Sequence, residues 1–147
     1  MTYQPQSILE ASLHKMTHTG NLATNDYFTI TSDVSGITGE SISGVSITLP
    51  YGCYAVYASI GCDRAGGFSD SLFYQWELDG TLIGCIGAAD CHDAVSTPNL
   101  DYLEVDQAVA TFEVSKTVTL KVKCTSCTAS TWTSNTDYTY VLIQRRA

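Results

Sequence analysis

Hydrophobic and polar residues alternate in the stretch from Val45 to Leu49, which is the period of a half-buried β-strand. Pro50 and Gly52 then interrupt the pattern, and a second strand is expected to begin at once. Neither face of this second strand, residues 53–60, carries a charge. In an antiparallel sheet with one face in water, the outward row should be polar. We therefore expect this strand to be covered on both faces, by its own core and by a neighbouring subunit.

Further short alternating runs predict strands along most of the chain. They cover residues 27–31, 72–79, 81–86, 100–105, 108–114, 118–124 and 138–144. Asp79-Gly80 is a strong hairpin signal, and Ser115-Lys116 marks a second hairpin. The last strand is also apolar on both faces, so it and residues 53–60 could lie side by side. Residues 87–99 and 125–135 are interpreted as loops. Together these elements predict an all-β, antiparallel jelly-roll sandwich of about eight to ten strands.

The first 25 residues show a different pattern. Ser7 followed by Glu10 matches a capping box, which predicts a short helix. The apolar positions of this helix are Leu9, Leu13 and Met16. A helix of about three turns has little stability alone, so it must dock on the domain or on a partner. We therefore divide the chain into an N-terminal arm, residues 1–25, and a jelly-roll domain, residues 26–147, with the three apolar side chains as the binding surface of the arm.

The composition narrows the classes of partner. Hydrophobic residues make up 44% of the 147 residues and charged residues only 15%, which is below the usual share of about 25%. The formal net charge of −8 argues against nucleic-acid binding, which needs a basic patch, and against docking to anionic membranes. The chain has no apolar run of membrane-spanning length and no secretion signal at its start. We expect a protein that is made in a cytoplasm.

Six cysteines offer several interpretations. Cys124-x-x-Cys127 is the sharpest local motif, but a redox site would need a helix N-terminus, and this pair is expected where a strand runs into a loop. A zinc site would need further ligands, for which Cys85, Cys91 and His92 are available. A disulfide among these cysteines is an alternative if the protein is oxidised outside the cell. Buried free thiols are the favoured interpretation, without metal or cofactor.

Other candidate sites have simpler explanations. His14 and His18 are four positions apart on the expected helix, but no third metal ligand is near, so we interpret them as exposed polar residues. An acidic region lacks the spacing of a calcium-binding loop and is interpreted as a solvated rim. It comprises Asp90, Asp93, Asp101, Glu104 and Asp106. The chain has no nucleophile elbow and no phosphate-binding glycine loop. We predict no catalytic residues.

The chain contains nine tyrosines and two tryptophans, and such side chains are typical of a sugar-binding tip or of a protein interface. Interface centres are enriched in such side chains. The predicted subunit-interface residues are Tyr51, Tyr54, Tyr57, Tyr138 and Tyr140. The alternative is that some of these rings complete the core.

The order of these features resembles the globular heads of the tumour necrosis factor and complement superfamily. Four passages within residues 44–144 carry the resemblance. They are Gly44-Val45-x-Ile47 leading through Pro50-x-Gly52-x-Tyr54, then Leu78-Asp79-Gly80, then Val118-x-Leu120-x-Val122, and finally Tyr138-x-Tyr140-Val141-x-Ile143. The resemblance implies a ten-stranded jelly roll that forms homotrimers through aromatic residues near a threefold axis. Similar jelly rolls occur in virus and phage decoration proteins and fibre tips.

The sequence departs from the animal members of that superfamily, because it shows no collagen stalk, membrane anchor or signal. The resemblance therefore favours a structural protein of a bacteriophage virion over a cytokine. We expect a non-enzymatic, homotrimeric decoration (cement) protein on the capsid surface. Its partner would be the major capsid protein, which the N-terminal arm would bind. The alternative is a host-recognition tip of a fibre or spike that binds glycans. A small metal-binding or hydrolytic enzyme is a more distant interpretation.

Overall fold

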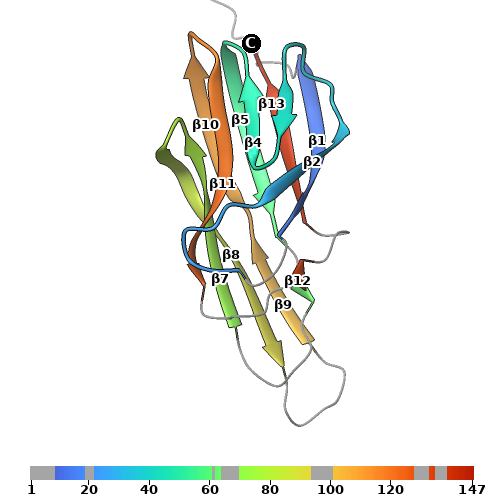
Figure 1. The fold of residues 1–147 in the computed structure, drawn as a ribbon, viewed down its shortest axis with the longest axis vertical. Coiled ribbons are helices and arrows are strands. Elements are labelled where there is room, and N and C mark those ends of the chain that lie inside the picture. Colours follow the sequence, from blue (N-terminus) through green and yellow to red (C-terminus); the bar gives the residue numbers. More distant parts are fainter. Residues whose placement is uncertain are drawn as a thin grey trace, which may run out of the picture.

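The computed structural model describes residues 9–18, 22–60, 62–63, 70–93, 101–127, 133–134 and 139–147, and the regular elements within them are all β-strands (Figure 1). The strands are β1 (Glu10–Thr17), β2 (Thr29–Val34), β3 (Ser41–Ser43), β4 (Ser46–Leu49), β5 (Gly52–Ser59), β6 (Cys62–Asp63), β7 (Asp70–Leu78), β8 (Thr81–Asp93), β9 (Asp101–Asp106), β10 (Ala108–Val114), β11 (Val118–Cys127), β12 (Thr133–Ser134) and β13 (Tyr140–Arg145).

Two antiparallel sheets form the body of the protein. Sheet A has the strand order β10-β5-β13-β1-β2, and sheet B has the order β3-β4-β11-β7-β8-β9. A small third sheet pairs β12 with β6. Figure 1 shows β10, β5, β13 and β1 running together in the upper part of the molecule, while β7, β8 and β9 reach beyond them at the lower end. The prediction of an all-β antiparallel sandwich is confirmed.

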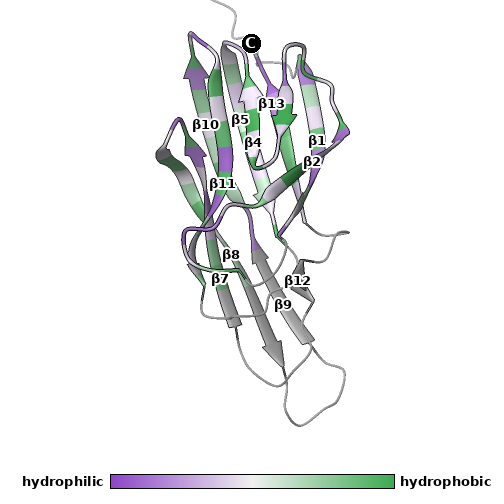
Figure 2. Ribbon diagram, in the orientation of Figure 1, coloured by the Kyte–Doolittle hydropathy of each residue, from purple (hydrophilic) through white to green (hydrophobic). Residues whose placement is uncertain are grey.

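The core lies between the two sheets. Hydrophobic residues recur at alternate positions along the strands, as Figure 2 shows by its green bands, so each sheet presents one apolar face to the other. The largest fully buried side chains include Trp76, Tyr74 and Phe28. Two of them also connect the sheets by hydrogen bonds, because Trp76 Nε1 donates to the Ala108 carbonyl of β10 at 3.0 Å and the Tyr74 hydroxyl accepts a hydrogen bond from the amide of Ile60, directly after β5, at 3.3 Å. Burial raises the pKa of the Tyr74 phenol above its ordinary value.

The predicted hairpins and loops had mixed outcomes. Asp79 and Gly80 form the turn between β7 and β8 with φ angles of 45° and 86°, as the Asp-Gly signal predicted. The stretch 87–99 is in part not a loop, because β8 continues to Asp93 and pairs with β7 on one side and β9 on the other. Likewise β11 extends to Cys127 within the predicted loop 125–135. Backbone pairing, rather than side-chain alternation, keeps these polar segments extended.

The helix predicted near the N-terminus is wrong over residues 10–17, which form strand β1 between β13 and β2. Side chains are buried at every second position, namely Ser12, His14 and Met16, which is the period of a strand. Two of these inward positions are polar, Ser12 and His14, so the alternation typical of a strand is not visible in the hydrophobicity of the sequence. Ser7 lies outside the described residues. The interpretation of His14 as an exposed residue is also wrong, because its side chain is fully buried.

Candidate functional site

Strands β5 and β13 are neighbours in sheet A, with register pairs running from Tyr140↔Ser59 to Arg145↔Tyr54. The sequence suggested that these two strands, each without a polar face, could lie side by side, and this pairing is confirmed. Their inward faces carry Val56, Ala58 and Ile143, all fully buried in the core. The outward face of sheet A is therefore the surface that the sequence analysis singled out.

A continuous line of apolar side chains crosses this outward face from one edge of sheet A to the other. Register pairing places Val34 beside Leu13, Leu13 beside Leu142, Leu142 beside Tyr57, and Tyr57 beside Val109. Directly paired residues share one face of a sheet. We call these five residues the apolar row. Val34 is 56% exposed and Leu13 40% exposed, and the other three are half-buried, so the protomer itself leaves the row open to solvent.

Polar and small residues border the apolar row. On one side Lys15, Tyr140 and Ser59 form the next register line, and the Gln107 amide donates to the Tyr140 hydroxyl at 3.2 Å. On the other side the line contains Ala11, Gln144, Ala55 and Thr111. The face thus has an apolar centre and a polar border, which is the usual arrangement of a protein interface.

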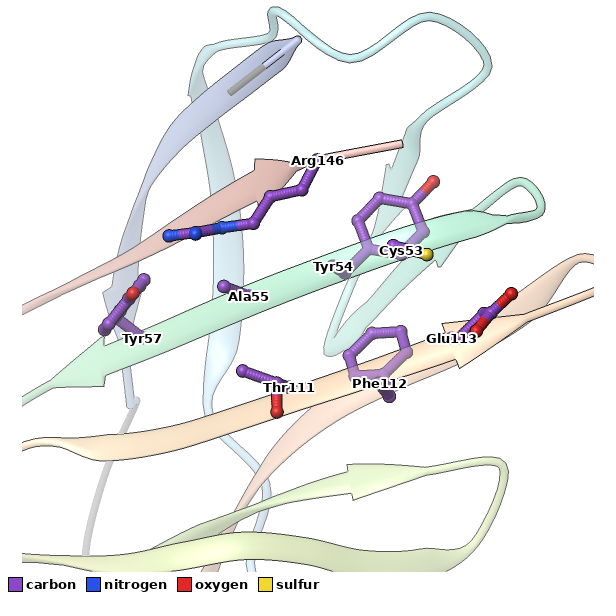
Figure 3. Close-up of a pocket in the computed structure, with 8 residues that line it drawn as sticks. All are labelled: Cys53, Tyr54, Ala55, Tyr57, Thr111, Phe112, Glu113 and Arg146. Carbon is purple, nitrogen blue, oxygen red and sulfur yellow. The ribbon is translucent and has the colours of Figure 1, made fainter. Parts of the chain in front are cut away.

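A groove of about 440 Å³ opens on this face over β5 and β10 (Figure 3). It is lined by Cys53, Tyr54, Ala55, Tyr57, Thr111, Phe112, Glu113 and Arg146. Figure 3 shows the Arg146 side chain running over Ala55 toward Tyr57. This explains why Ala55 is only 1% exposed although it lies on the outward face. Arg146 Nη2 donates to Gln144 Oε1 at 3.1 Å, whereas its Nε is buried and has no hydrogen-bond partner among the described residues.

The predicted interface tyrosines occupy different environments. Tyr57 and Tyr140 are half-buried on the outward face of sheet A. Tyr51 is 65% exposed, and the Arg145 guanidinium lies 5.6 Å from the centre of its ring. Tyr54 faces the core instead: its hydroxyl donates to the Pro50 carbonyl at 2.8 Å, and its ring is covered by the protomer itself. A fifth candidate, Tyr138, lies outside the described residues.

The predicted binding residues of the arm are also divided. Met16 is fully buried in the core, so it cannot contact a partner without unfolding β1. Leu13 belongs to the apolar row, and Leu9 is 63% exposed just before β1 begins. Only Leu9 therefore remains available as an exposed apolar contact separate from the face of sheet A.

A buried polar network links β1 to the segment that follows β2. His14 Nε2 lies 2.9 Å from Glu40 Oε1, and the Ser12 hydroxyl donates to Glu40 Oε2 at 2.7 Å. The Asp33 amide donates to His14 Nδ1 at 3.3 Å, which assigns the ring proton to Nε2 and makes it the donor to Glu40. Although a serine, a histidine and a carboxylate meet here, the His14 and Glu40 side chains are 0% and 1% exposed. No substrate can reach them, and we interpret the network as structural.

The described cysteines show no catalytic or metal-binding arrangement. Cys53, Cys85 and Cys124 are free thiols, and burial raises the pKa of Cys124 to about 12, which opposes thiolate chemistry there. Across the described part of the chain, no group of three or more His, Cys, Asp or Glu side chains is placed to hold a metal ion. The side chains of Cys91 and His92, which the zinc interpretation invoked, lie outside that part.

Sequence reasoning missed several residues of this face. Val34 and Val109 come from the two outer strands of sheet A, and Arg146 follows the last strand. The apolar character of the last strand on both faces did point to Leu142. The others could not be grouped from the sequence, because only the strand register brings them together.

Comparison with known proteins shows the fold. No protein-family profile matches the chain, and no curated protein matches it in sequence. Crystal structures of murine APRIL at pH 5.0, 8.0 and 8.5 are similar to it, with TM-scores of 0.59, 0.58 and 0.55. In each case the sequence identity is 10%, and the match covers 92% of this chain and 98% of the other. APRIL has the tumour necrosis factor jelly roll, so the resemblance inferred from the sequence is confirmed for the fold. Within the described segments, no helix could span a membrane.

Proposed function

We propose that this chain is a non-enzymatic structural protein that assembles as a homotrimer through the outward face of sheet A. The apolar row carries the proposal, because it crosses every strand of the sheet and the described part of the protomer leaves it at least partly exposed. Full burial of a Val, Leu or Phe-sized side chain is worth about 1.5–3 kcal/mol relative to exposure. Covering the exposed parts of five such side chains together supplies a substantial driving force for association.

The fold supports three as the number of copies in the proposed assembly. The tumour necrosis factor fold is that of a superfamily whose members form homotrimers, and the face that carries the apolar row contains Tyr57 and Tyr140 among its partly exposed residues. A cyclic arrangement of three copies is closed, so it buries the face without leading to open filaments. Tyr54 is not part of this interface, because its ring completes the core of its own protomer.

For the biological role, we propose a decoration protein on a bacteriophage-type capsid, with the major capsid protein as its partner. Three copies joined in one trimer can contact several capsid subunits at once, so modest single contacts add through avidity. Leu9, exposed before β1, and the residues that precede it would provide the capsid contact. The proposal needs no catalytic group, metal or cofactor.

The assembly proposal is tested by sedimentation of the wild type and of Leu142→Lys. We expect the wild type to sediment as a trimer and the variant as a folded monomer, because a charge would be placed in the centre of the apolar row. Leu82→Lys is the matched control, because Leu82 is an exposed leucine, 43% accessible, on strand β8 of sheet B. A trimeric Leu142→Lys protein, or a control that dissociates equally, would contradict this choice of interface.

The capsid role needs a separate experiment. The purified trimer should bind expanded empty capsids and raise their resistance to heat or osmotic shock. A variant that lacks residues 1–8 should remain a folded trimer, because β1 is retained, but should lose capsid binding. Binding to host cells or to a glycan array, without binding to capsids, would favour the alternative role of a host-recognition tip.

A further inference from the structure

The groove on sheet A contains two opposite charges, Arg146 and Glu113, that are not paired with each other or with another residue in the described part of the chain. The Arg146 amide donates to the Cys53 carbonyl at 2.7 Å, and Glu113 is the register partner of Cys53 on the other side of β5. Arg146 and Glu113 therefore lie on opposite sides of Cys53. Their backbones are two strand spacings apart, which is about 10 Å. Figure 3 shows the Arg146 side chain turned along β5 toward Tyr57, away from Glu113. Neither side chain forms an ion pair with any other described residue.

The position of the Arg146 guanidinium calls for an additional acceptor. One nitrogen is engaged by the Gln144 amide oxygen, but the buried Nε has no acceptor among the residues described. A buried donor that lacks a partner costs about 1–3 kcal/mol. The best complement to a guanidinium is a carboxylate, which accepts two parallel hydrogen bonds. The described part of the protomer leaves this position unfilled, so among those residues the site is incomplete in a single copy.

The outward face itself contains the complementary group. Among the described outward residues of β10, β5, β13 and β1, Glu113 is the one carboxylate. It is exposed, and it lies on β10, the terminal strand of sheet A. In a cyclic assembly one patch of each copy meets a different patch of the next copy, which is a heterologous contact. A neighbour whose β10 edge lies over the groove brings its own Glu113 to the level of Arg146.

The overall charge of the chain strengthens this argument. With a formal net charge of −8, separate copies repel one another, so close association is favoured where opposite charges meet. Arg146 is one of only seven basic residues in the chain.

We propose that, in the homotrimer, Arg146 of each protomer forms an intersubunit ion pair with Glu113 of the adjacent protomer, so that the groove is completed only by assembly. This inference rests on the proposed trimer. The occupant of the groove is then the β10 edge of a second copy, with its Glu113 carboxylate. Each protomer contributes Arg146 to one neighbour and Glu113 to the other.

Charge reversal tests the pairing. Arg146→Glu and Glu113→Arg should each raise the dissociation constant of the trimer at least tenfold, because each single change opposes two like charges. The double variant should return the dissociation constant to within about threefold of the wild type. Lys116→Glu, in the turn after β10, is the matched control and should leave it unchanged. Sedimentation equilibrium at two salt concentrations gives these constants, and circular dichroism confirms that each variant is folded.

The outcomes separate this inference from the proposed function. A monomeric wild type would overturn both. A wild-type trimer that Leu142→Lys dissociates, but that is insensitive to both charge reversals, would overturn the ion pair alone. Weakening by Arg146→Glu without rescue in the double variant would also overturn it, because Arg146 would then face a different carboxylate. If Arg146→Glu does not fold, Arg146→Gln combined with Glu113→Gln replaces it, and additive effects of the two changes would refute the pairing.

Discussion

The buried carboxylate of Glu40 is expected to be among the most important polar groups for stability. It accepts hydrogen bonds from the Ser12 hydroxyl at 2.7 Å and from His14 Nε2 at 2.9 Å, and all three side chains are inaccessible to water or nearly so. Glu40→Ala removes both acceptors at once. The Ser12 hydroxyl and the imidazole N–H would then be left as buried donors.

The expected loss can be worked out from these contacts. Each unsatisfied buried donor costs about 1–3 kcal/mol, and two donors are left unsatisfied here, the Ser12 hydroxyl and the His14 Nε2–H. We therefore expect Glu40→Ala to lower the free energy of unfolding by about 2–6 kcal/mol. This is a large part of the 5–15 kcal/mol typical of a whole domain. Replacing both Glu40 and His14 by leucine should cost less than the sum of the two single replacements, because the hydrogen bond between them is lost only once, while the Ser12 hydroxyl and the Asp33 amide still lose their acceptors.

Urea denaturation at one fixed protein concentration measures these differences, because the stability of an oligomer depends on concentration. The exposed carboxylate of Asp106 provides the control, and Asp106→Ala should change the free energy of unfolding by less than about 0.5 kcal/mol. A loss below about 1 kcal/mol for Glu40→Ala would refute the reasoning. A double-leucine variant as unstable as the sum of its single variants would refute it too, since the two residues would not be coupled.

Three further predictions concern other parts of the molecule. Gly84→Ala should destabilise the fold by at least about 2 kcal/mol in denaturation, because a Cβ would lie 2.2 Å from a carbonyl of β10 and the φ of +74° is unfavourable for alanine. At pH 8 an alkylating reagent should modify exposed Cys85 readily, whereas Cys124, which is buried and has a pKa raised to about 12, should react much more slowly, as peptide mapping would show. The pKa of Glu10 is lowered, chiefly because the Thr38 hydroxyl donates a hydrogen bond to its carboxylate. The ionised Glu10 therefore stabilises the fold at pH values above the ordinary glutamate pKa, and this stabilisation is lost as the pH falls through the lowered pKa. Thr38→Val should make the free energy of unfolding less dependent on pH below about 5, as denaturation at several pH values would show.

Much of the sandwich could be predicted from the sequence, because its strands have one face in the core. In β11, Val118, Leu120, Val122 and Cys124 are buried while the polar residues between them, Thr119, Lys121 and Lys123, are partly exposed, so the hydrophobic pattern and the pleat agree. The Asp79-Gly80 turn was predictable for a separate reason, since both residues adopt the positive φ angles that this hairpin requires.

The first strand could not be predicted in the same way. Its inward positions include Ser12 and His14, which are buried because Glu40, far along the chain, satisfies their hydrogen bonds. Its outward positions include Leu13, which is apolar although it faces out of the protomer. Both departures from the usual pattern depend on distant partners, and local periodicity contains no signal for them. The 3–4 spacing of Leu9, Leu13 and Met16 was therefore mistaken for a helix.

The candidate site was predictable in outline only. The lack of a polar face on two strands pointed to an assembly surface, and the structure places those strands next to each other. The apolar row itself depends on the register of all the strands in sheet A, so Val34 and Val109 could be assigned to it only from the fold. Strand alternation separates Tyr57 from Tyr54, and the structure shows that only Tyr57 faces outward.

In the proposed assembly, sister chains cover the outward face of sheet A. Sedimentation equilibrium of the unmodified protein at micromolar concentration tests this claim most directly. We predict a single species with three times the 15.9 kDa mass of one chain. A stable species of one chain mass, folded and unchanged when the concentration is raised, would show that the apolar row remains in water and would contradict the account.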